Sequence, residues 1–426
     1  MLTAVLQPRF DKRDKPSLRT VEADFTEAQS LIKAIDLENG YATIIPVRDL
    51  NPATFFGKGS VERVGEEMRD AQIKLAFVNA DLTPTQQRNL ERAWKLKVID
   101  RQGLILEIFS TRARTREGKL QVELAYLVYQ RSLLVKAWTH LERQRGGLGK
   151  TGGPGEMQKE LHRRVYDEKI KTIKRDLEHI VQNRAVQRAA RERVPFPVVA
   201  LVGYTNAGKS TLFNTLTNEK LLAKDLLFAT LDTTLRAVKL PSGRTVILSD
   251  TVGFISQLPT GLIAAFRATL EETIHADIIL HVRDIASNSS EAEAQDVKET
   301  LKHLELDPQT PIWEVWNKID LLPEAEQDAL TQSASLADPP SVAVSAITGR
   351  GLDKLLSNLD NALSAHDVTR NIILNASEGE ALAWLYRHTT ILDRRDDEAR
   401  IDLQIRASLA KMGQFNSLFH KENADT

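Results

Sequence analysis

Short apolar runs separated by polar, glycine-containing segments mark the middle of the chain. They lie at residues 198–202, 245–248, 311–316 and 342–344. Runs of this length are typical of buried strands, and residues 211–216, which follow the first run, have the pattern of a helix start. The alternation predicts an α/β domain over residues 196–366.

The first part of the chain, residues 1–111, shows a similar alternation. Thr83 and Pro84 form a helix start, because proline is tolerated in the first turn of a helix. The expected strands are residues 3–7, 42–47, 74–78 and 96–99, and the expected helices include residues 60–68 and 83–94. We therefore expect a small α/β domain here.

Residues 112–195 carry two apolar stripes with three-, four- and seven-residue steps, on either side of a glycine-rich loop at 145–155. Such stripes predict two long helices packed as an antiparallel hairpin. The stripes are Leu120, Leu124, Leu127, Leu134, Trp138 and Leu141, then Leu161, Val165, Ile170, Ile173, Leu177, Ile180 and Val181. The loop is either a flexible turn or a slender probe that can enter a narrow, RNA-lined cavity.

The last segment, residues 367–426, combines strand and helix patterns. Residues 371–374 resemble a strand, residues 378–389 resemble a helix, and residues 399–405 alternate between apolar and polar. This mixture predicts a small α+β domain at the end of the chain.

Composition excludes several kinds of chemistry. The 426 residues include no cysteine, so disulfides, thiolate metal sites and thiol catalysis are excluded, and the nine histidines show no metal-ligand spacing. The N-terminus lacks a signal-peptide pattern, and no stretch approaches the roughly 20 apolar residues of a membrane helix. We expect a soluble, cytoplasmic protein without stable membrane insertion that is monomeric when free.

Charge is distributed unevenly, although the net charge is only −1. Residues 111–195 contain 20 Lys and Arg against 10 Asp and Glu, which leaves −11 for the remainder. A basic segment in an otherwise acidic chain indicates a polyanionic partner such as RNA. A solvated helical surface is the alternative.

Residues 203–210 match G-x-x-x-x-G-K-S, the P-loop pattern, between a predicted strand and a predicted helix. Its glycines let backbone N–H groups turn onto phosphate oxygens, and the helix N-terminus adds a favourable dipole. Lys209 would reach the outer phosphates, and Ser210 would hold a magnesium ion. The expected nucleotide contacts are Gly203, Tyr204, Thr205, Asn206, Ala207, Gly208, Lys209, Ser210 and Thr211.

A second phosphate-site segment follows the apolar run at 245–248. It consists of Asp250, Thr251, Val252 and Gly253. An aspartate at the end of a strand beside a P-loop can reach the magnesium, usually through water. Gly253 lets its N–H approach the γ-phosphate, because no side chain stands in the way.

The base-selecting pattern N-K-x-D occurs at Asn317, Lys318 and Asp320, after the apolar run at 311–316. The aspartate can accept two hydrogen bonds from guanine, whereas adenine offers no donor there and would leave a buried charge unpaired. Ser345 and Ala346 follow the next apolar run and would offer a backbone N–H to the guanine oxygen.

A threonine that closes on magnesium when the γ-phosphate is present is also expected. Thr230, Thr233 and Thr234 all qualify, and spacing does not choose between them. Phe254 stands where many GTPases have a water-orienting Gln. Intrinsic hydrolysis should therefore be slow, with the missing group supplied by a partner macromolecule or by a potassium ion at Asn206. Asn206 as a loop cap is the alternative.

On these motifs the chain resembles the HflX family of ribosome-associated GTPases over almost its full length. The matching segments are residues 101–109, 117–125, 152–156 followed by Arg163 and Arg164, 201–211, 250–255, and Phe228, Ala229, Thr230, Leu231 and Asp232. The resemblance selects Thr230 as the magnesium threonine. The expected metal ligands are then Ser210, Thr230 and Asp250, the expected catalytic residues are Lys209, Thr230 and Gly253, and residues 228–232 join the nucleotide contacts.

The resemblance implies an α/β architecture: a P-loop GTPase domain, an N-terminal α/β domain, an antiparallel helical hairpin and a small C-terminal α+β domain. It implies binding to the large ribosomal subunit and its rRNA, splitting of stalled ribosomes under stress, and ribosome-stimulated hydrolysis of GTP to GDP and phosphate. Two alternatives stay open: a GTPase that assists ribosome assembly, and a GTP-latched silencing factor with little turnover.

The chain departs from the family pattern in places. Met157, Lys159 and His162 stand where the family usually has Thr, Leu and Asp, and Arg283 occupies a position that is usually apolar. In the switch, Thr233 replaces a common proline. The nucleotide motifs are intact, so these departures bear on the engagement of the ribosome.

Overall fold

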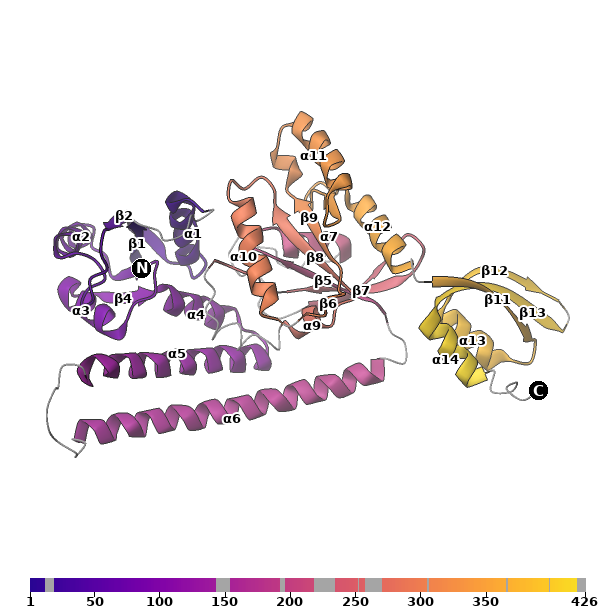
Figure 1. The fold of residues 1–426 in the computed structure, drawn as a ribbon, viewed down its shortest axis with the longest axis horizontal. Coiled ribbons are helices and arrows are strands. Elements are labelled where there is room, and N and C mark those ends of the chain that lie inside the picture. The colour runs from indigo at the N-terminus through magenta and orange to yellow at the C-terminus, as the bar shows by residue number, and fades with distance from the viewer. Residues whose placement is uncertain are drawn as a thin grey trace.

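The computed structural model describes residues 1–11, 19–142, 154–191, 196–217, 234–251, 253–256, 270–304, 306–364, 367–397 and 399–419. In this part of the chain the strands form three sheets, and helices pack on them (Figure 1). The predicted α/β fold class is confirmed. The P-loop domain lies between an N-terminal α/β domain and a small C-terminal domain, and a helical hairpin runs alongside the first two (Figure 1).

A parallel sheet with the strand order β2-β1-β3-β4 forms the N-terminal domain. The elements are β1 (Leu2–Phe10), α1 (Val21–Lys33), β2 (Glu38–Val47), α2 (Lys58–Asp70), β3 (Leu75–Val78), α3 (Pro84–Trp94), β4 (Lys97–Asp100) and α4 (Arg101–Arg112). Strand β2 lies on one side of β1, and β3 and β4 lie on the other. The connections therefore diverge at β1, and the edge between β1 and β3 is a topological switch point. Open α/β sheets leave a crevice at such a point.

Helix α3 begins at the predicted place because Thr83 and Gln86 cap it. Gln86 N donates to Thr83 Oγ1 at 3.2 Å, and Thr83 N donates to Gln86 Oε1 at 2.9 Å. This reciprocal pair satisfies two N–H groups that have no partner inside the helix.

The buried carboxylate of Asp100 caps the start of helix α4 and also binds the hairpin. Asp100 Oδ1 accepts hydrogen bonds from Gly103 N and from the hydroxyl of Tyr129, both at 2.8 Å. Burial raises the pKa of Asp100 although these hydrogen bonds oppose the shift. Tyr129 belongs to α5, so one side chain positions both the helix start and the adjoining hairpin.

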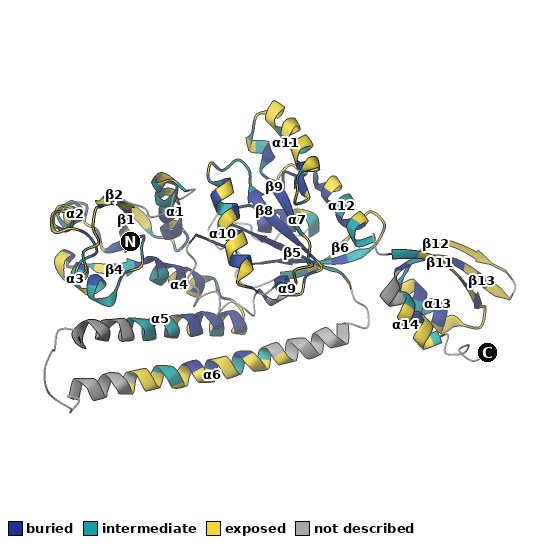
Figure 2. Ribbon diagram, viewed as in Figure 1, coloured by how far each residue is buried: buried dark blue, intermediate teal, exposed yellow. Residues whose placement is uncertain are grey.

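The hairpin consists of α5 (Arg116–Glu142) and α6 (Pro154–Arg191), which lie side by side (Figure 1). Its buried apolar residues include Leu124 and Leu127 on α5 and Ile170, Ile173 and Leu177 on α6. These residues belong to one apolar cluster with residues of α1 and α4. Figure 2 shows that the buried part of α5 is the part beside α4. The hairpin is therefore anchored on the N-terminal domain.

Part of the predicted hairpin stripe is not in the core. The prediction was wrong for Leu161 and Val165, which are 60% and 44% exposed. The side chains of Leu134, Trp138, Leu141 and Val181 lie outside the described residues, as does most of the glycine-rich loop. Apolar residues thus recur along α6 at helical spacing further towards its N-terminus than the segment of α6 that is buried.

The P-loop domain is built on a sheet with the order β10-β9-β8-β5-β7-β6, in which β6 alone is antiparallel to its neighbour. The strands are β5 (Val198–Gly203), β6 (Thr234–Lys239), β7 (Thr245–Asp250), β8 (Ile278–Asp284), β9 (Ile312–Asn317) and β10 (Ser341–Ala343). The helices are α7 (Lys209–Thr217), α9 (Glu271–Ile274), α10 (Ser290–Lys302), the 3-10 helix η1 (Ile319–Leu321), α11 (Glu324–Leu336) and α12 (Leu352–Ser364).

The C-terminal domain is an antiparallel sheet with the order β11-β13-β12 and two helices. It contains β11 (Asp367–Asn375), α13 (Gly379–His388), β12 (Thr390–Asp396), β13 (Arg400–Ser408) and α14 (Leu409–Phe419). The sequence did not predict β12, because four consecutive charged residues, 393–396, interrupt its apolar pattern. Charged side chains suit this strand, since it lies at the edge of the sheet.

The Asp100→Ala substitution should lower the free energy of unfolding by about 2–4 kcal/mol. It removes a helix cap, at a cost of about 1 kcal/mol, and leaves the Tyr129 hydroxyl without its acceptor, at a cost of about 1–3 kcal/mol. Urea denaturation would measure the change. Thr83→Ala is the control, since it removes a cap alone and should cost about 1 kcal/mol. Equal losses in the two variants would contradict the dual role of Asp100.

Candidate functional site

The P-loop connects the end of β5 to the start of α7, as the sequence predicted. Asn206 and Gly208 take left-handed backbone conformations, with φ of 61° and 92°. A Cβ atom on Gly208 would collide with the side-chain amide of Asn317, so this position requires glycine for both its conformation and its close packing. The loop is thereby pressed against the strand end that carries the base-selecting motif.

Lys209 is the first residue of α7, and its ammonium group is folded over the loop. Nζ donates to the carbonyl oxygens of Gly203 at 3.0 Å and Tyr204 at 2.8 Å. Burial lowers the pKa of Lys209 to about 8, although the charge of Asp250 opposes the shift. The lysine thus stands at the loop where phosphates are expected.

Ser210 and Asp250 come together from different elements. The neighbouring strands β5 and β7 run parallel with Leu201 opposite Asp250, so Asp250 ends its strand beside the P-loop. Ser210 Oγ donates to Asp250 Oδ2 at 2.9 Å. A hydroxyl and a carboxylate are the oxygen ligands that magnesium prefers, so this pair fits a magnesium ion.

The segment after Asp250 is tied to the P-loop through its backbone. Phe254 N donates to Gly203 O at 3.1 Å, and Thr205 N donates to Phe254 O at 2.7 Å. The Phe254 side chain is 2% exposed and packs in the same apolar cluster as Tyr204 and Ile255. A phenyl ring in the core cannot orient a water molecule by hydrogen bonding.

The N-K-x-D residues lie where β9 ends. Asn317 Nδ2 donates to Ala207 O at 2.9 Å, and Lys318 Nζ pairs with Asp284 at 2.7 Å. Asp320 Oδ1 is buried and has no hydrogen-bond partner among the described residues. A buried carboxylate oxygen that has no donor is suited to accept a hydrogen bond from a guanine N–H group, as predicted.

Two expected N–H donors are already engaged. Ala346 N donates to Asn317 Oδ1 at 3.0 Å, and Ser345 N donates to Arg350 O at 2.9 Å. A guanine oxygen would have to compete with Asn317 for Ala346. The sequence did not indicate this competition, because it depends on the approach of two strand ends.

The structure therefore gathers most of the predicted site at the carboxyl ends of β5, β7 and β9 and in the loop after β10. Phe228, Ala229, Thr230, Leu231, Asp232 and Val252 lie outside the described residues, and so does Thr233. Sequence reasoning missed Asp284, the partner of Lys318. Its position at the end of β8, between β5 and β9, was the available signal.

The unusual Arg283 also has a structural reason. Its side chain is 7% exposed and donates to Glu314 Oε2 at 2.6 Å on the adjacent strand β9. It also pairs with Glu291 of α10. Burial disfavours the charged arginine, but these carboxylates outweigh it and raise the pKa of Arg283. A buried ion pair thus replaces apolar packing at this position.

Comparison with known proteins identifies the arrangement. Four family models match in order: GTP-binding GTPase N-terminal at residues 22–110, GTP-binding GTPase middle region at 112–191, 50S ribosome-binding GTPase at 198–318, and HflX C-terminal domain at 329–417. GTPase HflX of Magnetococcus marinus is 46% identical over 389 residues, which are 91% of this chain and 89% of that protein. The chain belongs to the HflX family of GTPases.

Other relatives agree with this assignment. GTPase HflX of Escherichia coli is 39% identical over 384 residues, covering 90% of this chain and 89% of that protein. Among solved structures, the complex of SsGBP with GDP has a TM-score of 0.50 and 24% identity, and covers 85% of this chain and 98% of that one. That likeness shows the fold alone. As an HflX GTPase, the chain binds GTP and GDP and hydrolyses GTP. None of its described helices has the length and apolar character that crossing a membrane requires.

The Lys209→Ala substitution should weaken GTP binding by about 100-fold or more, because hydrogen bonds to a charged group contribute about 1.5–3 kcal/mol each. Isothermal titration calorimetry of the nucleotide-free protein would measure the loss. Lys354→Ala on α12, an exposed site, is the matched control. Unchanged affinity for GTP in Lys209→Ala would remove Lys209 from the phosphate site.

The Asp320→Asn substitution should shift base preference from guanine to xanthine. An amide can donate to the second carbonyl of xanthine but accepts only one of the two guanine hydrogen bonds. We expect GTP affinity to fall about 100-fold and XTP affinity to rise. Competition binding with the two nucleotides measures the ratio, with Asp328→Asn on the exposed face of α11 as the control. A retained preference for GTP would exclude Asp320 as the base selector.

Proposed function

We propose that the chain is a ribosome-binding GTPase that acts on the large ribosomal subunit and splits or rescues stalled ribosomes. The main support for this proposal is that one chain combines the nucleotide-binding domain of the HflX family with a long basic hairpin. The family model that matches residues 198–318 is described as a 50S ribosome-binding GTPase. A ribosomal partner would place the protein in the cytoplasm.

The nucleotide site supports the first half of the proposal. Lys209 and the P-loop would hold the phosphates, and Gly253 would sense the γ-phosphate. Asn317, Lys318 and Asp320 would select guanine. Magnesium would be held by Ser210, by Asp250 and by Thr230, and when bound it would neutralise phosphate charge during hydrolysis. The close pair Ser210 and Asp250 supports this assignment.

Hydrolysis should depend on a partner because Phe254 is buried. The buried phenyl ring of Phe254 cannot orient the attacking water. We therefore propose that the ribosome supplies the missing group or rearranges the site so that another group orients the water. A potassium ion at Asn206 is a second source. Asn206 is an exposed residue of the P-loop.

The hairpin supports binding to rRNA. Helix α6 presents exposed basic side chains along its described length: Arg163, Arg164, Lys169, Lys171, Lys174 and Arg175. Lysine and arginine that neutralise phosphates release bound counterions, which drives binding and makes it dependent on salt. Arg163 and Arg164 are nearest to the glycine-rich loop and are therefore the proposed contacts.

A second candidate is a GTP-latched silencing factor, with which the buried Phe254 is equally compatible. Slow hydrolysis suits a latch as well as a gated enzyme. Phosphate release from GTP, measured with and without purified large subunits in potassium and in sodium, separates the two. Strong stimulation by the subunit supports the gated GTPase, and separation of intact ribosomes then tests splitting. Subunit binding without stimulation supports the latch.

Replacing Arg163 and Arg164 together by glutamate should lower the affinity for large subunits at least 10-fold and reduce the salt dependence of binding, since phosphate contacts are lost. Affinity for GTP should stay unchanged. Sedimentation with purified subunits at several salt concentrations measures both effects. Lys354→Glu is the control on the P-loop domain. If the double variant binds like the wild type at every salt concentration, this end of the hairpin is not the rRNA contact.

A further inference from the structure

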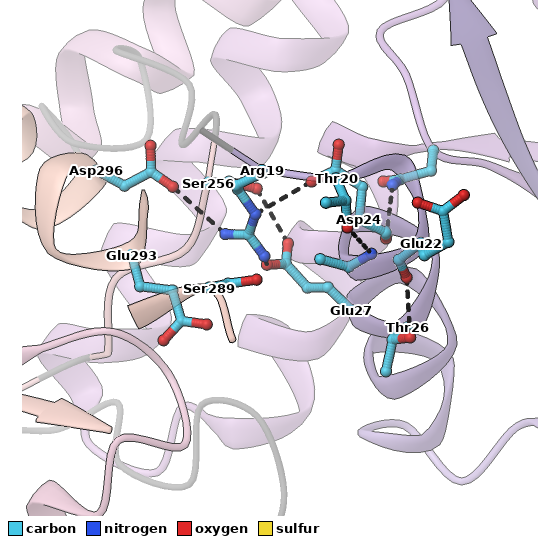
Figure 3. Close-up of polar contacts among 12 residues, drawn as sticks. Arg19, Thr20, Glu22, Asp24, Thr26, Glu27, Ser256, Ser289, Glu293 and Asp296 are labelled. Atoms are coloured by element: carbon cyan, nitrogen blue, oxygen red, sulfur yellow. Dashed lines mark hydrogen bonds and ion pairs between the residues drawn. The ribbon is translucent and has the colours of Figure 1, made fainter. Parts of the chain in front are cut away.

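Two charge networks of the P-loop domain differ in how their carboxylates are paired. The first lies where the N-terminal domain meets the P-loop domain, and Figure 3 shows its members Arg19 and Glu27 beside Ser256. Glu27 Oε1 pairs with Arg101 and accepts from Ser256 Oγ at 3.1 Å. Glu27 Oε2 accepts from Arg19 Nη2 at 2.7 Å and from the hydroxyl of Tyr204. Both oxygens of this carboxylate have donors, so the network links the two domains.

The second network lies at the ends of β8 and β9, and one of its carboxylate oxygens has no donor. Lys318 Nζ donates to Asp284 Oδ2 at 2.7 Å. Asp320, two residues after Lys318, keeps its buried Oδ1 without a hydrogen-bond partner in the part of the chain that the structure describes. The lysine of the base-selecting motif is thus bound to an aspartate of the neighbouring strand, while the aspartate of its own motif keeps an oxygen open.

The open oxygen of Asp320 is unusual, because buried charges in proteins are normally paired and an unpaired one is costly. An ion pair with Lys318 would relieve that cost, yet Lys318 is bound to Asp284. An oxygen that is already open accepts an N–H group of a ligand without a bond being broken first. An oxygen in an ion pair would have to exchange its partner. A base that brings N–H donors therefore gains from this arrangement.

Backbone contacts at the end of β8 hold Asp284 in place. Asp284 lies opposite Asn317 in the register of β8 and β9, and Ile285 N donates to Asn317 O at 3.1 Å. Asp284 Oδ1 accepts from Ala286 N, also at 3.1 Å, and Oδ2 accepts from Lys318. The two oxygens thus have separate tasks: one closes the turn after β8, and the other binds the lysine.

Lys318 itself occupies a strained position. Its backbone φ is 65°, in the left-handed region that favours glycine. Such strain persists only where the surrounding contacts determine the conformation. The preceding Asn317 is one anchor, because its side chain donates to Ala207 O at 2.9 Å and accepts from Ala346 N at 3.0 Å. The ion pair with Asp284 is a second anchor, and it also determines where the ammonium group lies.

We propose that Asp284 is a positioning residue for base recognition: it binds the Lys318 ammonium, so that the carboxylate of Asp320 stays open to the two N–H donors of a guanine base. Without Asp284, the acidic residue nearest to Lys318 along the chain is Asp320. An ion pair between those two residues would compete with the base. The proposal rests on the assignment of Asp320 as the acceptor for guanine.

The test compares the affinities of the full-length chain for GDP and for pyrophosphate, measured by competition binding in magnesium. Asp284→Asn keeps the size of the side chain and an oxygen for Ala286 N, but it removes the charge that binds Lys318. GDP affinity should fall about 10-fold, the size expected when a hydrogen bond to a charged group is lost. Pyrophosphate has no base, so its affinity should not fall. A merely structural role predicts a parallel loss for both ligands.

Asp328→Asn is the matched control, because Asp328 forms an exposed pair with Arg350 on another part of the same domain. It should change neither affinity. Asp284→Glu keeps the charge and should bind GDP within about threefold of the wild type, which guards against an Asp284→Asn variant that fails to fold.

A double-mutant cycle shows whether Asp284 acts through Lys318. Lys318→Ala removes the ammonium group that Asp284 binds. In that background, Asp284→Asn should change GDP affinity by less than about twofold, since no pair remains to be broken. An equal loss of GDP affinity with and without Lys318 would mean that Asp284 acts independently of the lysine, and would overturn the inference.

Failure of the proposed function has a different signature. If Asp320→Asn leaves the preference for guanine unchanged, the base site itself is assigned wrongly. If Asp320→Asn shifts the preference but Asp284→Asn leaves the affinities for GDP and pyrophosphate as they are in the wild type, the inference about Asp284 alone is overturned.

Discussion

The buried carboxylate of Glu27 links the N-terminal domain to the P-loop domain, and two arginines compensate its charge. Glu27 is almost inaccessible to water, and its charge is tolerable only because Arg19 and Arg101 surround it. A lone buried charge would cost several kcal/mol, and removal of one partner from such a group is strongly destabilising. The geometry is therefore specific. It places the P-loop, the segment after Gly253 and the carboxyl edge of the N-terminal sheet at fixed positions relative to one another.

Parallel sheets explain why so many functional side chains converge. In the P-loop domain, Asp284 and Asn317 end the neighbouring strands β8 and β9, and Asp250 ends β7 on the other side of β5, so residues far apart in the chain come to one edge of the sheet. The N-terminal sheet uses the same geometry differently. Its Gln7 accepts a hydrogen bond from Asn79, Asn79 accepts one from Arg101, and Arg101 in turn donates to Ser256. The switch point of the N-terminal sheet thus lies next to the segment after Gly253, because Arg101 contacts both Asn79 and Ser256.

The hairpin is an extension of the N-terminal domain. Its apolar face shares a cluster with α1 and α4, and Tyr129 binds the carboxylate that caps α4. The hairpin and α4 are therefore in direct contact. Arg101 is the first residue of α4, so the path from hairpin to P-loop is short and runs through packed elements.

The sequence by itself determined the fold class, the capped start of α3, the P-loop and the order of the nucleotide motifs. Each of these depends on local spacing or on short patterns with a direct physical meaning. The sequence could not determine that Leu161 and Val165 are exposed, that β12 is a strand, or that Ala346 N is engaged by Asn317. Those features depend on which surfaces meet. Above all, no spacing along the chain relates Glu27, Arg101 and Ser256, and only the tertiary structure decides that these distant residues share one buried site, because charges in a dry interface require partners wherever the fold places them.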